Sequence, residues 1–235
     1  HHKNAVWGIT ARNREQNFAL NLLMNPEIDF VSLLGQAGTG KTLLTLAAGL
    51  VQVLETKRFT EIIMTRATVP VGEDIGYLPG TEQEKLSPWM QPIYDNLEYL
   101  LSEGGSPQGN GTRKGNSQGA GSSRIDYLQD SNLLDIRALA YIRGRSLPQQ
   151  FIIVDEAQNL TPHEAKTIIT RAGQGTKLVF TGDPYQIDHP YLDSTSNGLT
   201  HIVEKFKDHP IAAHVTLVKG ERSPLAEIAS QIMEQ

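Results

Sequence analysis

The sequence contains no cysteine, which excludes disulfide bonds and thiolate metal sites. That absence also fits the reducing cytoplasm, where we expect the protein to act. No run of ~18 consecutive apolar residues occurs, so we expect no membrane-spanning helix. Positive charge is not in excess either, because 21 Lys and Arg face 26 Asp and Glu and leave a net charge of −5. A globally basic nucleic-acid binder is therefore excluded, and any polyanion must meet a local basic patch.

The residues that are present suit one folded domain. Apolar residues make up 39% of the 235 residues, enough to bury a core. Short apolar runs are typical of strands buried on both faces of a parallel sheet. Such runs occur at 30–34, 61–65, 151–154, 177–181 and 215–218. With helical patterns between them, such as 42–54, they predict an α/β fold: a single domain with a mostly parallel sheet flanked by helices.

We expect residues 7–235 to form this domain and residues 1–6, which begin with His1 and His2, to be a tag remnant or leader. Residues 102–123 are almost wholly Gly, Ser, Asn, Gln and charged residues, a composition that cannot bury apolar surface. We expect a flexible surface loop there, inside the domain rather than between two. Thr161 to Glu164 has the pattern of a capping box, and Ser223 precedes a last predicted helix.

Residues 35–42, GQAGTGKT, match the phosphate-binding pattern G-x-x-x-x-G-K-[ST]. A glycine-rich turn followed by a chance Lys-Thr is the alternative, but a strand pattern precedes the motif and a helix pattern follows it. In such a loop backbone N–H groups bind phosphate oxygens, Lys41 reaches the β- and γ-phosphates, and Thr42 offers a hydroxyl to Mg²⁺. The nucleotide-binding residues expected from this motif are Gln36, Ala37, Gly38, Thr39, Gly40, Lys41, Thr42 and Leu43.

A second apolar run delivers Asp155 and Glu156 at its carboxyl end, where ligands bind in open α/β sheets. We expect Asp155 to hold Mg²⁺ and Glu156 to orient and deprotonate the attacking water. Alone, such a strand end could be a simple acidic cap, but beside a phosphate loop it predicts a hydrolase. Gln186 follows another strand pattern. It either contacts the γ-phosphate and the lytic water or is a solvated residue of a Gly-Asp-Pro turn.

Together these segments resemble motifs I, II and III of superfamily 1 helicases: GTGKT, DEAQ at 155–158 and GDPYQ at 182–186. Asn13-x-x-Gln16 is similar to the N-x-x-Q motif that reads adenine in that superfamily. The resemblance implies that Gln16 selects ATP, whereas alone it would be a solvated helical residue. Arg222 resembles an arginine that lies near the γ-phosphate; its alternative is a surface ion pair with a neighbouring glutamate.

A more specific resemblance is to the PhoH family of P-loop ATPases, from about Trp7 to the C-terminus. It is carried by RATVPVGEDIGYLPG at 66–80, YIRGRSL at 141–147 and GERS at 220–223. Residues 159–171 and 186–193 are similar to the PhoH half of PIN–PhoH fusion proteins. The resemblance implies one RecA-like lobe, ATP-dependent unwinding or translocation of single-stranded RNA, a homo-oligomeric ring that is commonly a hexamer, and a PIN nuclease domain. No run of carboxylates precedes Trp7, so we expect the chain as given to lack nuclease activity.

Three arginines are candidates for nucleic-acid contact. Arg143 and Arg145 form a compact basic pair, which could line an RNA path or make salt bridges between subunits. Arg66 follows a strand directly and is either an RNA contact or a subunit-interface residue.

We therefore predict an ATPase motor acting on single-stranded RNA, with Lys41, Glu156, Gln186 and Arg222 as catalytic residues. The alternative is a ring-forming, nucleotide-dependent regulatory module for an attached or partner nuclease, without motor activity. A small-molecule kinase is disfavoured, because Glu156 beside Asp155 suits activation of water rather than of a substrate hydroxyl.

Overall fold

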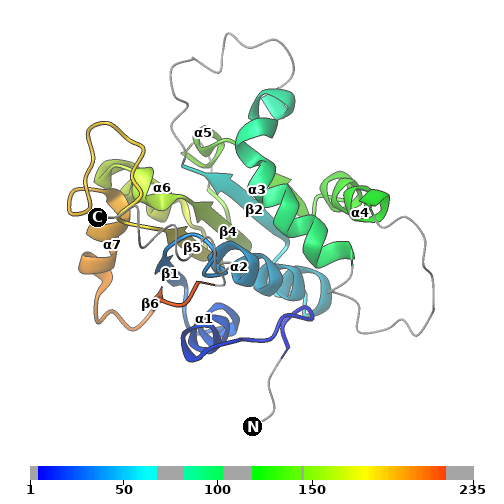
Figure 1. Cartoon of the computed structure of the whole chain (residues 1–235), viewed down its shortest axis with the longest axis horizontal. Helices are drawn as coiled ribbons and strands as arrows, with labels where there is room; N and C mark the ends of the chain where they lie inside the picture. The colour runs from blue at the N-terminus through cyan, green and yellow to red at the C-terminus, as the bar shows by residue number, and fades with distance from the viewer. Residues whose placement is uncertain (1–4, 68–81, 103–117, 144–145, 221–235) are drawn as a thin grey trace, which may run out of the picture.

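A six-stranded sheet runs through the middle of the molecule (Figure 1). The computed structural model describes residues 5–67, 82–102, 118–143 and 146–220. The strands are β1 (Phe30–Gly35), β2 (Glu61–Arg66), β3 (Leu134–Ile136), β4 (Gln150–Asp155), β5 (Lys177–Gly182) and β6 (Ala212–Leu217). They are ordered β3-β2-β4-β5-β1-β6, and each described pairing is parallel. The predicted α/β fold with a parallel sheet is confirmed.

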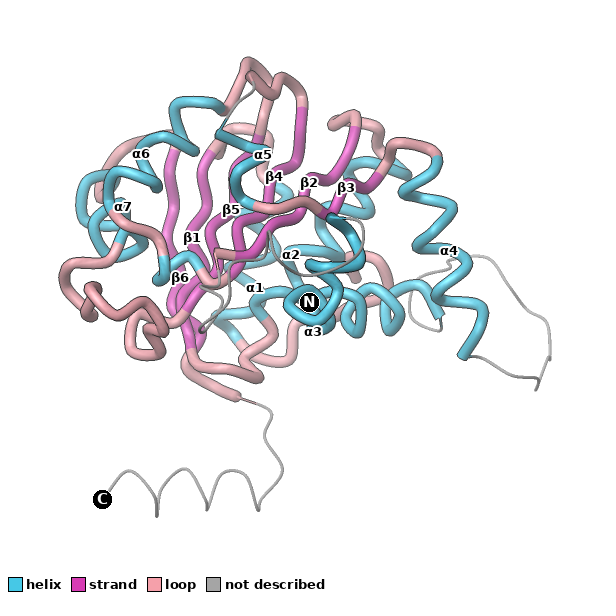
Figure 2. Tube along the Cα trace, turned by 90° about the horizontal axis from the view of Figure 1, so that it is seen from above, coloured by secondary structure: helices cyan, strands magenta, loops and turns pink. Residues whose placement is uncertain are grey.

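Helices cover both faces of the sheet (Figure 2). They are α1 (Arg14–Met24), α2 (Lys41–Leu50), η1 (Val51–Glu55), α3 (Glu82–Ser102), α4 (Gln118–Asp130), α5 (Leu139–Arg143), η3 (Ala157–Asn159), α6 (Pro162–Arg171) and α7 (Gly198–Phe206). Helices α1 to α4 pack in one hydrophobic cluster, and α5 to α7 pack in a second on the opposite face. Within the described ranges, no helix has both the length and the apolar character needed to cross a membrane.

The central strand β4 shows why its sequence is continuously apolar. Phe151 and Ile153 belong to the first cluster, whereas Ile152 and Val154 belong to the second. Successive side chains of a strand point to opposite faces, so a strand covered on both sides needs apolar residues at every position. The same burial keeps its carboxyl end, at Asp155, fixed in the core.

Most predicted elements are confirmed, with differences at the edges. Strand β6 begins at Ala212, before the predicted start at 215, and the capping box of Thr161 and Glu164 is present. The short strand β3 gave no apolar run of its own. It is held by pairing with β2. The helix predicted after Ser223 lies outside the described residues.

The polar stretch 102–123 differs from the predicted loop at both ends. Ser102 is the last residue of α3, and residues 118–123 belong to α4, while 103–117 lie outside the described residues. Gly121 packs against the backbone of Glu98 on α3, where an added Cβ would lie 3.4 Å from the Glu98 Cα. Ile125 and Leu128 are buried further along α4. Packing of this apolar side therefore outweighs the low helix propensity of the Gly- and Ser-rich start.

Side chains from other elements hold the carboxyl end of α1. Lys177 of β5 is 1% exposed. It donates to the carbonyls of Leu22 (2.7 Å) and Asn25 (2.8 Å). Gln52 of η1 donates to the carbonyl of Leu23. Burial, followed by the charge of Arg58, lowers the pKa of Lys177 to about 7, although Asp29 acts in the opposite direction.

Candidate active site

The loop between β1 and α2 needs glycine at several positions. Gly38 and Gly40 adopt φ angles of 81° and 91°, in the left-handed region that other residues rarely occupy. A Cβ on Gly35 would lie 2.5 Å from the carbonyl oxygen of Leu217 on β6. The loop therefore curls tightly before α2 begins at Lys41, which leaves the N–H groups of the first helical turn free of intrahelical partners.

Lys41 folds back over this loop. Its Nζ donates to the carbonyl oxygens of Gly35 (2.5 Å) and Gln36 (2.9 Å). Burial lowers the pKa of Lys41, while the negative charges of Asp155, Glu156 and Asp183 act against that shift. Both partners are neutral carbonyls, so an anionic phosphate would form a stronger, charge-assisted bond with the ammonium group.

Two hydroxyl groups converge on Asp155, which is 4% exposed. Thr181 Oγ1 donates to Asp155 Oδ1 at 2.6 Å, and Thr42 Oγ1 lies 3.4 Å from the same oxygen. The Thr42 hydroxyl and Asp155 carboxylate are hard oxygen ligands of the kind Mg²⁺ prefers, with waters and substrate phosphates filling its other positions. In the described part of the chain no three His, Asp or Glu side chains form a metal-binding group. A Mg²⁺ site of this kind does not require such a group, because phosphates and waters supply the other ligands. These donors therefore fit Mg²⁺.

Glu156 sits at a strained point of the backbone. Its φ and ψ are 55° and 37°, the left-handed conformation that is uncommon outside glycine and clusters at functional sites. Glu156 Oε2 accepts a hydrogen bond from Gln158 Nε2 at 2.6 Å. Its Oε1 is 3.4 Å from the Arg66 guanidinium. Both carboxylate oxygens are therefore held by neighbouring side chains.

Gln158 connects the carboxylates to the segment that follows β5. It is fully buried, donates to the backbone carbonyl of Gln186 at 2.9 Å, and accepts from the Asp183 N–H at 3.2 Å. A Cβ on Gly182 would lie 2.3 Å from Gln158 Oε1, so this contact requires glycine there. Sequence reasoning quoted Gln158 within its motif but gave it no role; its place two residues after Glu156 was the available signal.

The main chain of Gln186 reaches this network, whereas its side chain is exposed. The Arg66 side chain is 14% exposed and turns inward to the two carboxylates. This inward position follows from the sheet, because the β2–β4 register pairs Arg66 with Asp155. Contact with RNA or with a neighbouring subunit stays a prediction.

The start of α1 contacts the phosphate-binding loop through Gln16. Asn13 caps α1 by accepting from the Gln16 N–H. Gln16 is 6% exposed; its Oε1 accepts from the Arg12 N–H at 2.9 Å and its Nε2 donates to the Thr39 carbonyl at 3.1 Å. Both side-chain amide atoms are thus bonded to the protein, so Gln16 is not the solvated helical residue that was its alternative.

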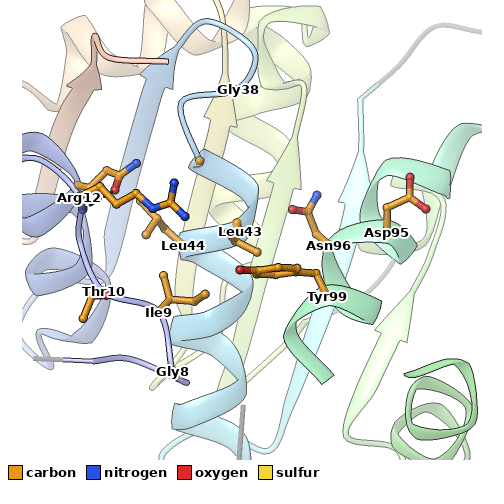
Figure 3. A pocket seen from close by; sticks show the side chains of 12 residues that line it. Gly8, Ile9, Thr10, Arg12, Gly38, Leu43, Leu44, Asp95, Asn96 and Tyr99 are labelled. Atoms are coloured by element: carbon orange, nitrogen blue, oxygen red, sulfur yellow. Dashed lines mark hydrogen bonds between the residues drawn. The ribbon is translucent and has the colours of Figure 1, made fainter. Parts of the chain in front are cut away.

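A cavity of about 500 Å³ lies beside Gln16 (Figure 3). Figure 3 shows Tyr99 reaching from α3 toward Leu43 of α2, with Arg12 on the opposite side. The other residues that line the cavity are Gly8, Ile9, Thr10, Gly38, Gly40, Leu44, Asp95 and Asn96. The motifs gave no hint of a contribution from α3. The spacing of Asp95, Asn96 and Tyr99 along one helix side was the only signal.

Comparison with known proteins identifies the family. The profile described as PhoH-like protein matches residues 8–234. The chain belongs to this family. Protein PhoH2 of Bacillus subtilis (strain 168) is 52% identical over 228 residues, covering 97% of this chain and 48% of that protein. Protein PhoH2 of Mycolicibacterium smegmatis is 38% identical over 231 residues, covering 98% and 48%. The PhoH-like chain thus spans about half the length of the curated relatives it matches.

A solved structure supports the fold of this PhoH-like domain. The large terminase from a thermophilic bacteriophage, in complex with ADP, aligns with 94% of this chain and 50% of its own at a TM-score of 0.53. The identity is 16%, so the likeness concerns the fold alone. It confirms the RecA-like P-loop architecture, and the family match makes the chain a P-loop NTPase of PhoH type.

Three arginines of the predicted site lie wholly or partly outside the described residues. Arg145 and Arg222 lie outside the described residues. The backbone of Arg143 ends α5, but its side chain lies outside the described part. The roles expected for these arginines stay predictions.

Proposed function

We propose that this PhoH-like domain binds ATP with Mg²⁺ and hydrolyses it. The observation that carries the proposal is the 3.4 Å approach of Thr42 Oγ1, from α2, to Asp155 Oδ1, from β4. This approach joins the phosphate loop and the carboxylate strand in one site. Mg²⁺, held there by Thr42 and Asp155, would neutralise charge on the phosphates.

The protein groups have separable tasks in this mechanism. Lys41 leaves the Gly35 and Gln36 carbonyls and binds the phosphates, together with the loop N–H groups. Glu156 orients the attacking water and takes its proton, and Gln158 keeps the carboxylate in place. Because Gln158 also holds the Gln186 carbonyl, a change at the γ-phosphate reaches the segment after β5 through this one side chain.

We place the nucleobase in the cavity beside Gly38 and Gly40. Tyr99, half exposed on α3, offers a ring on which the base stacks, while Leu43 and Ile9 provide apolar contact. Gln16 supports this pocket through Thr39, and reading of the adenine edge by its amide would require exchange of the Arg12 contact.

Replacing Tyr99 by alanine is expected to raise the Kd for ATP about tenfold, because loss of base stacking costs roughly 1–3 kcal/mol. Binding of inorganic tripolyphosphate, which has no base, should stay within about twofold of the unaltered protein. Calorimetric titration measures both. Tyr127→Ala, an exposed tyrosine of α4, is the matched control. Equal weakening of both ligands would contradict this base position.

We further propose that hydrolysis drives unwinding of RNA or movement along single-stranded RNA, within a homo-oligomeric ring and beside a PIN nuclease domain. Support comes from the PIN–PhoH resemblance and from relatives about twice the length of this chain. The test is ATP turnover with and without single-stranded RNA, combined with strand displacement and native mass. We expect at least severalfold stimulation in a ring-sized assembly. If RNA leaves the rate of ATP hydrolysis unchanged and no strand is displaced, although the protein assembles into a ring, the result would support a regulatory module instead.

A further inference from the structure

Arg66 bridges the catalytic carboxylates and α3. Its Nε lies 3.2 Å from Asp155 Oδ2, and a terminal nitrogen lies 3.4 Å from Glu156 Oε1. The other terminal nitrogen donates to the carbonyl of Trp89 on α3 at 2.8 Å. The Nε contact with Asp155 is an ion pair rather than a hydrogen bond, whereas the two terminal nitrogens donate to Trp89 and Glu156.

The two oxygens of Asp155 face different partners. Oδ1 is directed at the hydroxyls of Thr42 and Thr181, whereas Oδ2 is directed at Arg66. A cation at Thr42 and the guanidinium therefore share one buried carboxylate from opposite sides. Their like charges repel, so each weakens the hold of the other on Asp155.

The stretch of α3 that carries Trp89 has fewer backbone hydrogen bonds within the helix than a regular helix would have. Pro88 and Pro92 lie inside α3, and each lacks the N–H that would bond to the preceding turn. The far end of the helix is anchored in the core by Leu97, Leu100 and Leu101, each at most 5% exposed. Between these points α3 carries Asp95, Asn96 and Tyr99 of the cavity.

We propose that Arg66 is a positioning residue that couples cation and nucleotide occupancy at Asp155 to the position of α3, a proposal that rests on the proposed function. Without a cation, Arg66 holds Asp155 and Glu156 and binds the Trp89 carbonyl. Binding of a cation at Thr42 and Asp155 loosens the guanidinium, and its contact with Trp89 changes. The α3 side of the nucleobase cavity and the two carboxylates thereby respond together to cation binding.

The two tryptophans of the chain allow a direct test. In a Trp7→Phe protein, Trp89 is the single reporter. Its emission, and nucleotide binding in parallel, are followed during titration with Mg²⁺ at a fixed ATPγS concentration that saturates the site only when Mg²⁺ is present. We expect a clear Trp89 response when Arg66 is present. In the Trp7→Phe, Arg66→Gln protein the nucleotide still binds, but the Trp89 response falls by more than half. The Mg²⁺ concentration giving half-maximal nucleotide binding falls about fivefold, because the competing positive charge is gone.

Two variants separate this role from a merely structural one. Arg66→Lys keeps the charge but not the pair of terminal nitrogens, so its Mg²⁺ requirement stays near that of the unaltered protein while the Trp89 response is lost. Arg171→Gln, at an exposed position on α6, changes neither quantity. Thermal unfolding by circular dichroism verifies that each variant is folded.

An unchanged Trp89 response in Arg66→Gln, or a rise in its Mg²⁺ requirement, overturns the proposal. Nucleotide binding by the Trp7→Phe protein without any Trp89 response overturns it too and leaves the proposed function intact. Absence of nucleotide binding by the unaltered protein overturns the proposed function, and this proposal with it.

Discussion

Replacing Glu156 by glutamine is expected to lower kcat for ATP by about a thousandfold while the Kd for ATP changes little. General base catalysis contributes on the order of 10²–10⁴ in rate, and a neutral amide cannot take the proton from water. The side chains are nearly isosteric, and the glutamine oxygen can still accept the hydrogen bond of Gln158. Phosphate release measures kcat, and calorimetric titration measures Kd.

Glu204→Gln is the matched control, since Glu204 is an exposed carboxylate on α7. It should hydrolyse ATP at the rate of the unaltered protein. Undiminished turnover in Glu156→Gln would contradict the water-activating role. A parallel loss of binding would mean instead that the negative charge of Glu156, which faces Arg66, is needed to hold the nucleotide site together.

The buried ammonium group of Lys177 should make stability depend on pH. Its pKa is lowered to about 7 in the folded protein, against an ordinary value of 10.5 in the unfolded chain. Between these values the unfolded chain binds more protons, so this group makes the free energy of unfolding rise with pH. The expected gain between pH 7 and pH 9 is about 2 kcal/mol.

Denaturant unfolding of the unaltered protein and of Lys177→Met is measured at pH 7 and pH 9. The change in the free energy of unfolding between the two pH values is then compared between the two proteins. The variant should lack the rise, whatever its stability at pH 7. Lys166→Met, at an exposed position on α6, is the control and should keep the full rise. If Lys177→Met showed the same pH dependence as the unaltered protein, the Lys177 ammonium group would not lose its proton at a lowered pKa in the folded state.

The sheet and the phosphate loop could be predicted because their signals are local. Continuous apolar runs predicted five strands, and the glycine spacing at 35–42 predicted the loop with its backbone conformation. Strand β3 carries no such signal. Its pairing with β2 depends on the register between two separate parts of the chain.

The inward position of Arg66 could not be predicted, for a related reason. Arg66 and Glu156 are 90 positions apart, and only the β2–β4 register brings them together. The sequence shows only that Arg66 follows a strand, which is compatible with contact to RNA or to another subunit. The contribution of Tyr99 was missed in the same way, because it requires that α3 packs beside α2.

The anchoring of α1 limits how the nucleotide site can open. An isolated helix of 11 residues is marginal in water, yet here its carboxyl end is held by Lys177 and Gln52, from β5 and η1. Its amino end is tied to Thr39 through Gln16. Unravelling α1 alone would break contacts with two core elements, so it belongs to the same cooperative unfolding unit as the sheet. If the proposed base cavity opens locally, we therefore expect α3, the helix with two internal prolines on the other side of the cavity, to move.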